Sequence, residues 1–287
     1  MPASEVQDLV NNASNLVSLP EISIRVNELA NNPDSTADDM GKVISQDPAL
    51  VARMLKIANS AFYGVSNEVD TISRAIAILG INKIRDLVIS TAASDTFDGI
   101  PNDLITMQDF WHHSLYCGLL AQILAKKSKK IKSESIFIAG LLHDIGQLLM
   151  FNQLPEKSHE TILLLMEGSE ELETYEAERH IFGFDHMQVG AALIKKWKLA
   201  SVLEECVEFH HEPQNAKNFP VEVALINIAN AVAVMADFDS MSEDDEIPMI
   251  NPLSWKLTGL SKDDLPDAIK KAQEEIKEIE AVLFPSK

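Results

Sequence analysis

The chain has 287 residues, a formal net charge of −20 and 46% apolar residues. This length allows one large or two modest domains, and the ordinary apolar content argues against a disordered chain. A surface this acidic repels phosphate backbones and anionic lipid headgroups, so we expect neither a nucleic-acid partner nor a membrane partner.

The sequence carries little sign of export or of disulfide bonds. Cys117 and Cys206 lie in apolar helical patterns without metal-ligand spacing, which predicts buried thiols. The first ten residues lack a basic and apolar leader, and no stretch approaches the ~20 apolar residues of a membrane span. We therefore expect a cytoplasmic protein. One basic run, residues 126–132, predicts a solvated helix end, with a phosphate-binding or partner-docking patch as the alternative.

Apolar residues recur with helical spacing along most of the first hundred residues, and few segments resemble strands. Ser35 or Thr36 can cap one helix, Asp47-Pro48 opens another, and Thr71 begins a third. The helices predicted here cover residues 4–17, 22–29, 36–44, 48–58, 71–79 and 81–89.

The rest of the chain divides at two polar stretches. A loop at residues 99–102 predicts a subdomain boundary near residue 100, and the acidic stretch 240–248 predicts an exposed mobile loop. Between them, the nearly all-apolar helix from Val221 to Met235 is expected to be central. The tail from Ser261 to Leu283 predicts one or two charged helices. The expected divisions are an N-terminal helical subdomain (residues 1–100), a second helical subdomain (101–240), and an acidic loop with C-terminal helices (241–287).

The sharpest motif is the pair His143-Asp144 within residues 140–146. Helical spacing places Ile136 and Ala139 on the same side as His143, so we expect this side chain to point inward. Gly146 is expected near a helix end. A buried neutral imidazole beside a carboxylate can bind a divalent metal, or it can be a hydrogen-bonded core pair.

His186 lies at a second informative position. Asp185 before it is a good N-cap, and Gln188 completes a capping-box pattern. At a helix start, the positive end of the dipole is expected to lower the pKa of His186 and keep the ring neutral, as metal binding requires.

The other histidines fall into two groups. His112 and His113 begin an apolar helix, and His210 and His211 end a helix that starts near Ser201, whereas His159 and His180 lie in polar surroundings and are expected to face solvent. The apolar helix after residue 220 has two polar exceptions on one face, Asn227 and Asn230, and a buried asparagine must be hydrogen-bonded.

The order of these motifs resembles the HD superfamily of metal-dependent phosphohydrolases. Residues 17–235 more closely resemble the HDOD family, the HD-related output domain of bacterial signalling proteins. The resemblance implies an all-α fold, an HD-domain-like helical bundle preceded by an N-terminal helical subdomain. Its most specific part is Asn59-Ser60-Ala61-Phe62-Tyr63-Gly64, and the other matching segments are residues 19–20, 46–50, 75–80, 110–114 and 183–186.

The resemblance also implies a set of metal ligands and one departure from it. Asn230 stands where the catalytic HD pattern has an aspartate, and a neutral carbonyl oxygen is a weaker ligand that puts efficient activation of water in doubt. The implied cofactor is one or two divalent transition-metal ions (Fe, Mn or Zn). The implied ligands are His113, His143, Asp144, His186, His210 and His211.

These features favour a signalling output module that acts through protein or ligand binding with little or no catalysis. Its partner would be a signalling protein or a small nucleotide-like ligand. Residues Asn59, Ser60, Phe62 and Tyr63 would form the interaction surface, although the same segment also fits a helix-ending turn with core aromatics. The alternatives are a phosphohydrolase acting on nucleotides or cyclic dinucleotides, and a purely structural histidine cluster. No lysine or arginine is evidently tied to the histidines to hold a phosphate.

Overall fold

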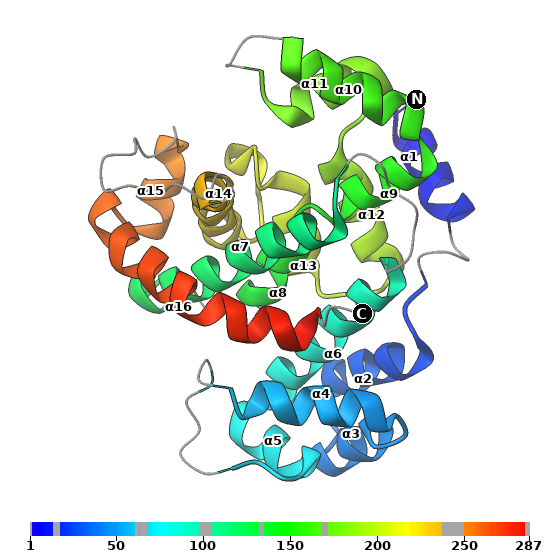
Figure 1. Cartoon of the computed structure of the whole chain (residues 1–287), viewed down its shortest axis with the longest axis vertical. Helices are drawn as coiled ribbons and strands as arrows, with labels where there is room; N and C mark the ends of the chain where they lie inside the picture. Colours follow the sequence, from blue (N-terminus) through cyan, green and yellow to red (C-terminus); the bar gives the residue numbers. More distant parts are fainter. Residues whose placement is uncertain are drawn as a thin grey trace.

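The computed structural model describes residues 2–13, 18–60, 63, 68–97, 105–131, 135–167, 172–236 and 250–284. The regular elements in these ranges are all helices, which confirms the predicted all-α fold (Figure 1). The first half holds α1 (Pro2–Asn12), α2 (Glu21–Asn31), α3 (Ala37–Ile44), α4 (Pro48–Ala58), α5 (Ile72–Leu79) and α6 (Ile81–Phe97). The second half holds α7 (Met107–Ser128), α8 (Ile136–Leu142), α9 (Ile145–Gln153), α10 (Pro155–Glu167), α11 (Thr174–Phe182), α12 (His186–Lys196), α13 (Ser201–Phe209), α14 (Pro220–Ala236), α15 (Pro252–Thr258) and α16 (Leu265–Leu283), with 3-10 turns at Pro213–Asn215 and Lys262–Asp264.

The predicted helix starts in the N-terminal half are confirmed. Thr36, Asp47 and Thr71 each accept a hydrogen bond from a backbone N–H in the first turn of α3, α4 and α5. These side chains satisfy donors that have no partner within the helix, which fixes where each helix begins.

The first helix is shorter than expected. It was predicted to reach Val17, but α1 ends at Asn12, and residues 14–17 lie outside the described ranges. Two consecutive asparagines, which are weak helix formers, account for the early end. α1 packs against α12, where the Lys196 ammonium donates a hydrogen bond to the Val10 carbonyl at 2.8 Å.

Helices α7, α8 and α14 form the centre of the molecule (Figure 1). Side chains along α14, such as Leu225 and Ile226, are fully buried, which confirms the predicted central helix. α7 and α8 cross closely, because a Cβ on Gly140 would lie only 2.7 Å from the Cα of Gly118. This crossing brings the first turns of α7 near the end of α8. Both cysteines are buried, as predicted.

The basic run is more than a solvated helix end, so that prediction was incomplete. The Lys127 ammonium lies 3.1 Å from the Asp267 carboxylate and donates to the Asp264 carbonyl. Lys130 donates to the carbonyls of Lys256 and Leu257 at the end of α15. Lysines near the end of α7 therefore dock the C-terminal helices through backbone carbonyls, and the position of Lys130 at the end of α15 accords with the helix dipole.

Several expectations lie on residues that the structure leaves undescribed. The boundary loop at residues 99–102 and the acidic stretch 240–248 fall outside the described ranges, and the division into subdomains stays a prediction. No helix in the described ranges combines the length and the apolar composition that a membrane span requires.

Glu205 on α13 holds the turn that leads into α14. Its carboxylate accepts hydrogen bonds from the backbone N–H groups of Lys217, Asn218 and Phe219, and from the Asn218 side chain at 2.9 Å. Burial would raise the pKa of Glu205, but these donors lower it below its ordinary value. We expect Glu205→Gln to reduce the free energy of unfolding by about 1–3 kcal/mol at neutral pH, measured by urea denaturation.

The pH dependence supplies the check on that prediction. Because the pKa of Glu205 is lower in the folded state, its contribution is present above the unfolded pKa and is lost as the pH falls through the folded pKa. The difference between the wild type and Glu205→Gln should therefore shrink toward acid pH. Glu204→Gln is the control, and an equal loss of stability in both variants would contradict the assignment.

Candidate metal centre

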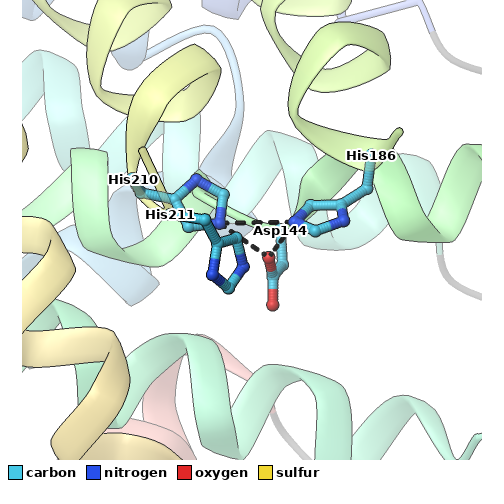
Figure 2. A group of neighbouring side chains, drawn as sticks. All are labelled: Asp144, His186, His210 and His211. Carbon is cyan, nitrogen blue, oxygen red and sulfur yellow. Dashed lines mark hydrogen bonds and ion pairs between the residues drawn. The ribbon is translucent and has the colours of Figure 1, made fainter. Parts of the chain in front are cut away.

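Five helices bring the predicted ligands together at one point in the described structure. His113 lies on α7, the pair His143-Asp144 fills the junction between α8 and α9, and His186 is the first residue of α12. His210 and His211 directly follow α13. Figure 2 shows Asp144 between His186 and the two histidines after α13. Two overlapping groups could hold metal ions: one is His113, His143 and Asp144, and the other is Asp144, His186, His210 and His211.

Asp144 divides its two carboxylate oxygens between these groups. Oδ2 lies 3.2 Å from His143 Nε2 and 3.8 Å from His113 Nε2. Oδ1 lies 3.2 Å from His186 Nε2 and 3.4 Å from His210 Nε2. Asp144 therefore lies where a bridging carboxylate would lie between two neighbouring metal positions.

Backbone carbonyls fix the orientation of two of the rings. His143 Nδ1 lies 2.7 Å from the Gly140 carbonyl, and His210 Nδ1 lies 2.9 Å from the Val207 carbonyl. A carbonyl can only accept, so each Nδ1 carries the proton and each Nε2 presents a lone pair in the neutral ring. This is the arrangement by which proteins orient histidine ligands toward a metal.

Glu178 on α11 holds the third ring. Its Oε2 atom lies 2.6 Å from His186 Nδ1 and accepts a hydrogen bond from the His186 backbone N–H at 2.8 Å. Burial would lower the pKa of His186, but Glu178 and Asp144 on either side of the ring raise it to about 10. The expectation that the helix dipole lowers this pKa was therefore wrong, because two carboxylates outweigh a partial charge.

The donor set fits a divalent transition metal. Asp144 Oδ1 is buried and makes no hydrogen bond, although two ring nitrogens lie close to it. The Nε2 atoms of His113 and His143 are 3.4 Å apart, and those of His186 and His210 are 3.3 Å apart. Ligand atoms that share a tetrahedral ion with bonds of ~2.1 Å are separated by roughly 3.4 Å. Ligand atoms that converge at this spacing fit a cation between them.

Two of the pKa shifts in the cluster, those of Asp144 and His210, favour metal binding. Burial would raise the pKa of Asp144, but the histidines around it, His143 first, hold it well below the usual range. Burial lowers the pKa of His210 to about 4, so that ring is neutral at physiological pH. A carboxylate that stays ionised beside a neutral imidazole is the state in which both groups bind metals.

Asn230 is the residue of α14 that contacts His113. It is buried on α14, and its Oδ1 atom lies 3.1 Å from His113 Nε2. A carbonyl oxygen thus occupies the place expected for an additional ligand, but it brings no negative charge. The other predicted asparagine, Asn227, donates to the His210 carbonyl and accepts from the buried Ser254 hydroxyl on α15, each at 2.8 Å.

Three residues on α11 that lie beside the cluster were not predicted from the sequence. Besides Glu178, these are Tyr175, whose ring stacks on His211 at 5.1 Å, and Arg179, whose guanidinium lies over the Tyr175 ring. Arg179 also forms ion pairs with Asp185 and Glu212. An arginine therefore does lie beside the cluster, contrary to expectation, although it is paired with carboxylates. Glu178 shares a helix face with the buried Phe182, four residues on, and that pattern was the available signal.

The remaining predicted positions are accounted for where the structure describes them. Asp185 caps α12 with Gln188, and His159 and His180 are exposed, as expected. His211 is half-buried at the edge of the cluster. Gly146 does not end a helix; it lies in the first turn of α9.

The segment predicted to contact a partner lies far from the metal ligands along the chain. The Asn59 side chain bridges to Val69, donating to its carbonyl and accepting from its N–H. Ser60 is buried, Tyr63 is half-buried, and Phe62 lies outside the described residues. Burial raises the pKa of the Tyr63 phenol, with a contribution from Asp86. The partner-binding role of these residues stays a prediction.

We expect Glu178→Gln to weaken binding of Zn²⁺ or Mn²⁺ by about 10–100-fold, because it removes the charged partner that orients His186. The measurement is a competition titration against a chromophoric chelator. Glu176→Gln, on the exposed face of α11, is the matched control. An unchanged affinity in Glu178→Gln would contradict the role of the Glu178 charge in orienting His186.

Comparisons with known proteins identify the family and the fold. The family model described as HDOD domain matches residues 16–213. An HDOD domain protein of unknown function from Geobacter sulfurreducens is 25% identical, with a TM-score of 0.75 and coverage of 99% of both chains. A protein described as a candidate phosphohydrolase from Shewanella amazonensis SB2B is 27% identical, with a TM-score of 0.75 and coverage of 96% of this chain and 97% of that one.

A curated relative is longer than this chain. An uncharacterized protein from Treponema pallidum (strain Nichols) is 24% identical over 244 residues, which cover 84% of this chain and 46% of the relative. The matched region thus spans about half the length of that relative.

Proposed function

The chain belongs to the HDOD domain family, and from this premise we propose that it is a metal-binding output module of bacterial signal transduction. In this proposal it acts by binding a protein or a small nucleotide-like ligand, with little or no catalysis. The ions are one or two divalent Fe, Mn or Zn, because imidazole and carboxylate donors suit these metals. We also propose a cytoplasmic location and the three-part division of the chain at about residues 100 and 240.

The proposal rests mainly on the uncharged side chain at position 230. The Asn230 carbonyl oxygen lies 3.1 Å from His113 Nε2, where a carboxylate would add a negative charge to the cluster. A bound ion at His113, His143 and Asp144 would have only Asp144 to balance its charge. Such an ion can organise the helices around it, but a neutral amide holds the ion more weakly than a carboxylate would and cannot accept a proton from a bound water.

A second candidate function is a metal-dependent phosphohydrolase acting on nucleotides or cyclic dinucleotides. The specific observation in its favour is Asp144, whose two oxygens face separate pairs of histidine nitrogens. Two adjacent ions, when bound, can stabilise the attacking and leaving oxygens of a phosphoryl displacement. On this alternative, His113 and His143 would hold one ion, and His186, His210 and His211 would hold the other.

Asn230→Asp distinguishes the two functions. We expect it to strengthen metal binding by at least about tenfold, because a carboxylate replaces a neutral ligand in a buried site. It should also raise hydrolysis of bis-p-nitrophenyl phosphate from background to a measurable rate. Asn11→Asp on the exposed face of α1 adds the same charge elsewhere and should change neither.

The proposal fails if the wild-type protein already turns over a nucleotide or cyclic dinucleotide at a useful rate and loses that activity in His143→Ala. That result would establish the hydrolase, and it would make the uncharged Asn230 irrelevant to catalysis.

A further inference from the structure

Helix α10 buries polar side chains and leaves apolar side chains outside the core. The side chains it buries are Ser158 and Thr161. Within the part of the chain that the structure describes, the run Ile162-Leu163-Leu164-Leu165-Met166 lies outside the hydrophobic core, with Ile162, Leu164 and Leu165 half-buried. Leu163 is 44% exposed and Met166 is 78% exposed. A contiguous apolar run outside the core, with exposed side chains at its centre, marks a candidate binding surface.

This apolar run lies on a helical hairpin at the edge of the molecule. α10 and α11 pack together and lie at the top of the view in Figure 1, away from α2–α5. We call this pair of helices the α10–α11 hairpin. α10 has 13 residues, a length along which a second helix can pack.

The charges around the apolar run are mostly negative. Glu156, Glu160 and Glu167 are exposed on α10, and Glu173 and Glu176 are exposed on or beside α11. The cations of the hairpin are engaged: Lys157 lies over the Phe182 ring, and Arg179 is paired with Asp185 and Glu212.

These charges favour one kind of binding partner. A second copy of the chain would bring its own acidic side chains against these, and an anionic membrane would repel them. A helix with an apolar stripe between basic flanks could pack its stripe against the apolar run and pair its basic side chains with the carboxylates.

The hairpin is also connected to the metal centre. Glu178 and Arg179 on α11 contact His186, Asp185 and Glu212, and Tyr175 stacks on His211. A partner bound to the outer face of α10 would therefore lie on the element that orients one of the predicted ligands.

We propose that the outer face of the α10–α11 hairpin, with Leu163 and Met166 at its centre, is the docking surface for a basic amphipathic helix of a partner protein. This deepens the proposed signalling function, on which it rests, by naming the surface and the chemistry of the partner.

The test uses a synthetic amphipathic helical peptide of leucine and lysine, titrated against the full chain by fluorescence anisotropy. We expect micromolar binding that weakens by at least about tenfold in Leu163→Glu/Met166→Glu. Added glutamates would strengthen an attraction that is only electrostatic, so a loss of affinity identifies apolar docking. The control is Ile78→Glu/Val234→Glu, which alters two other exposed apolar residues and adds the same charge.

A second variant tests the charged rim. Glu160→Lys/Glu167→Lys should weaken binding of the lysine peptide, with a smaller difference at high salt. Binding that is equal or tighter in Leu163→Glu/Met166→Glu, or equal for a leucine and glutamate peptide, would overturn the proposal.

Two further outcomes would assign the surface to another occupant and overturn it. One is a concentration-dependent dimer that is lost in Leu163→Glu/Met166→Glu. The other is cosedimentation of the wild type, but not that variant, with phosphatidylglycerol vesicles. Peptide binding is measured with and without chelator, so a failure of docking is distinguishable from a failure of the metal site.

Discussion

Replacing Asp144 by asparagine is expected to weaken metal binding by well over about a hundredfold, more than the loss of an outer partner of a ligand. Asp144 is the carboxylate that both candidate ligand groups share, and each of its oxygens faces two ring nitrogens. Asparagine keeps the size of the side chain but removes the charge. Competition titration with Zn²⁺ or Mn²⁺ measures the loss.

Thermal unfolding is an independent measurement of how Asp144→Asn affects metal binding. A ligand at a thousand times its dissociation constant stabilises the folded state by about 4 kcal/mol, so added metal should raise the unfolding temperature of the wild type. Asp144→Asn should show little or no rise, whereas the control Asp109→Asn, in the first turn of α7, should respond like the wild type. A metal response in Asp144→Asn equal to that of the wild type would contradict the bridging role.

Gly146→Ala is expected to cost at least about 3 kcal/mol of the free energy of unfolding, because it overpacks a backbone crossing. A Cβ on Gly146 would lie 2.0 Å from the His186 carbonyl oxygen and 2.6 Å from the Gly190 nitrogen. These backbone atoms can give way only if α9 and α12 separate. That separation would also move His186 away from Asp144, so metal binding should fall together with stability.

Gly41→Ala is the control for this prediction. Gly41 lies within α3, where an added Cβ would meet only the Ser73 hydroxyl at 3.3 Å and the tip of Ile76 at 4.0 Å. Alanine is also the better helix former, so Gly41→Ala should stay within about 1 kcal/mol of the wild type. Urea denaturation compares the two, and a loss below about 1 kcal/mol in Gly146→Ala would show that α9 and α12 do not pack as closely as described.

Local sequence patterns predicted most of the helices because their signals are local. Thr36, Asp47 and Thr71 fix helix starts through hydrogen bonds to neighbours a few residues away. The short helix α15 was missed, although Asn251 caps it and Pro252 occupies its first position. The docking of Lys127 and Lys130 onto the C-terminal helices was also missed, because those contacts join residues more than a hundred positions apart.

The candidate metal ligands could be predicted from the sequence, whereas the arrangement of charges around them could not. The order of His113, His143, Asp144, His186 and His210 along the chain carried the resemblance, and the described structure brings these residues together. The sharing of Asp144 between two groups depends on how five helices pack, which no local pattern encodes. The pKa of His186 was mispredicted for the same reason, since Glu178 and Asp144 approach it from other helices.

Elemental analysis of the purified protein, beside Asp144→Asn prepared in the same way, tests the central claim that this cluster binds metal. We expect about one or two equivalents of Fe, Mn or Zn per wild-type chain, and loss of that metal in the variant. Less than about a tenth of an equivalent in the wild type, both as purified and after incubation with each metal, would contradict the account.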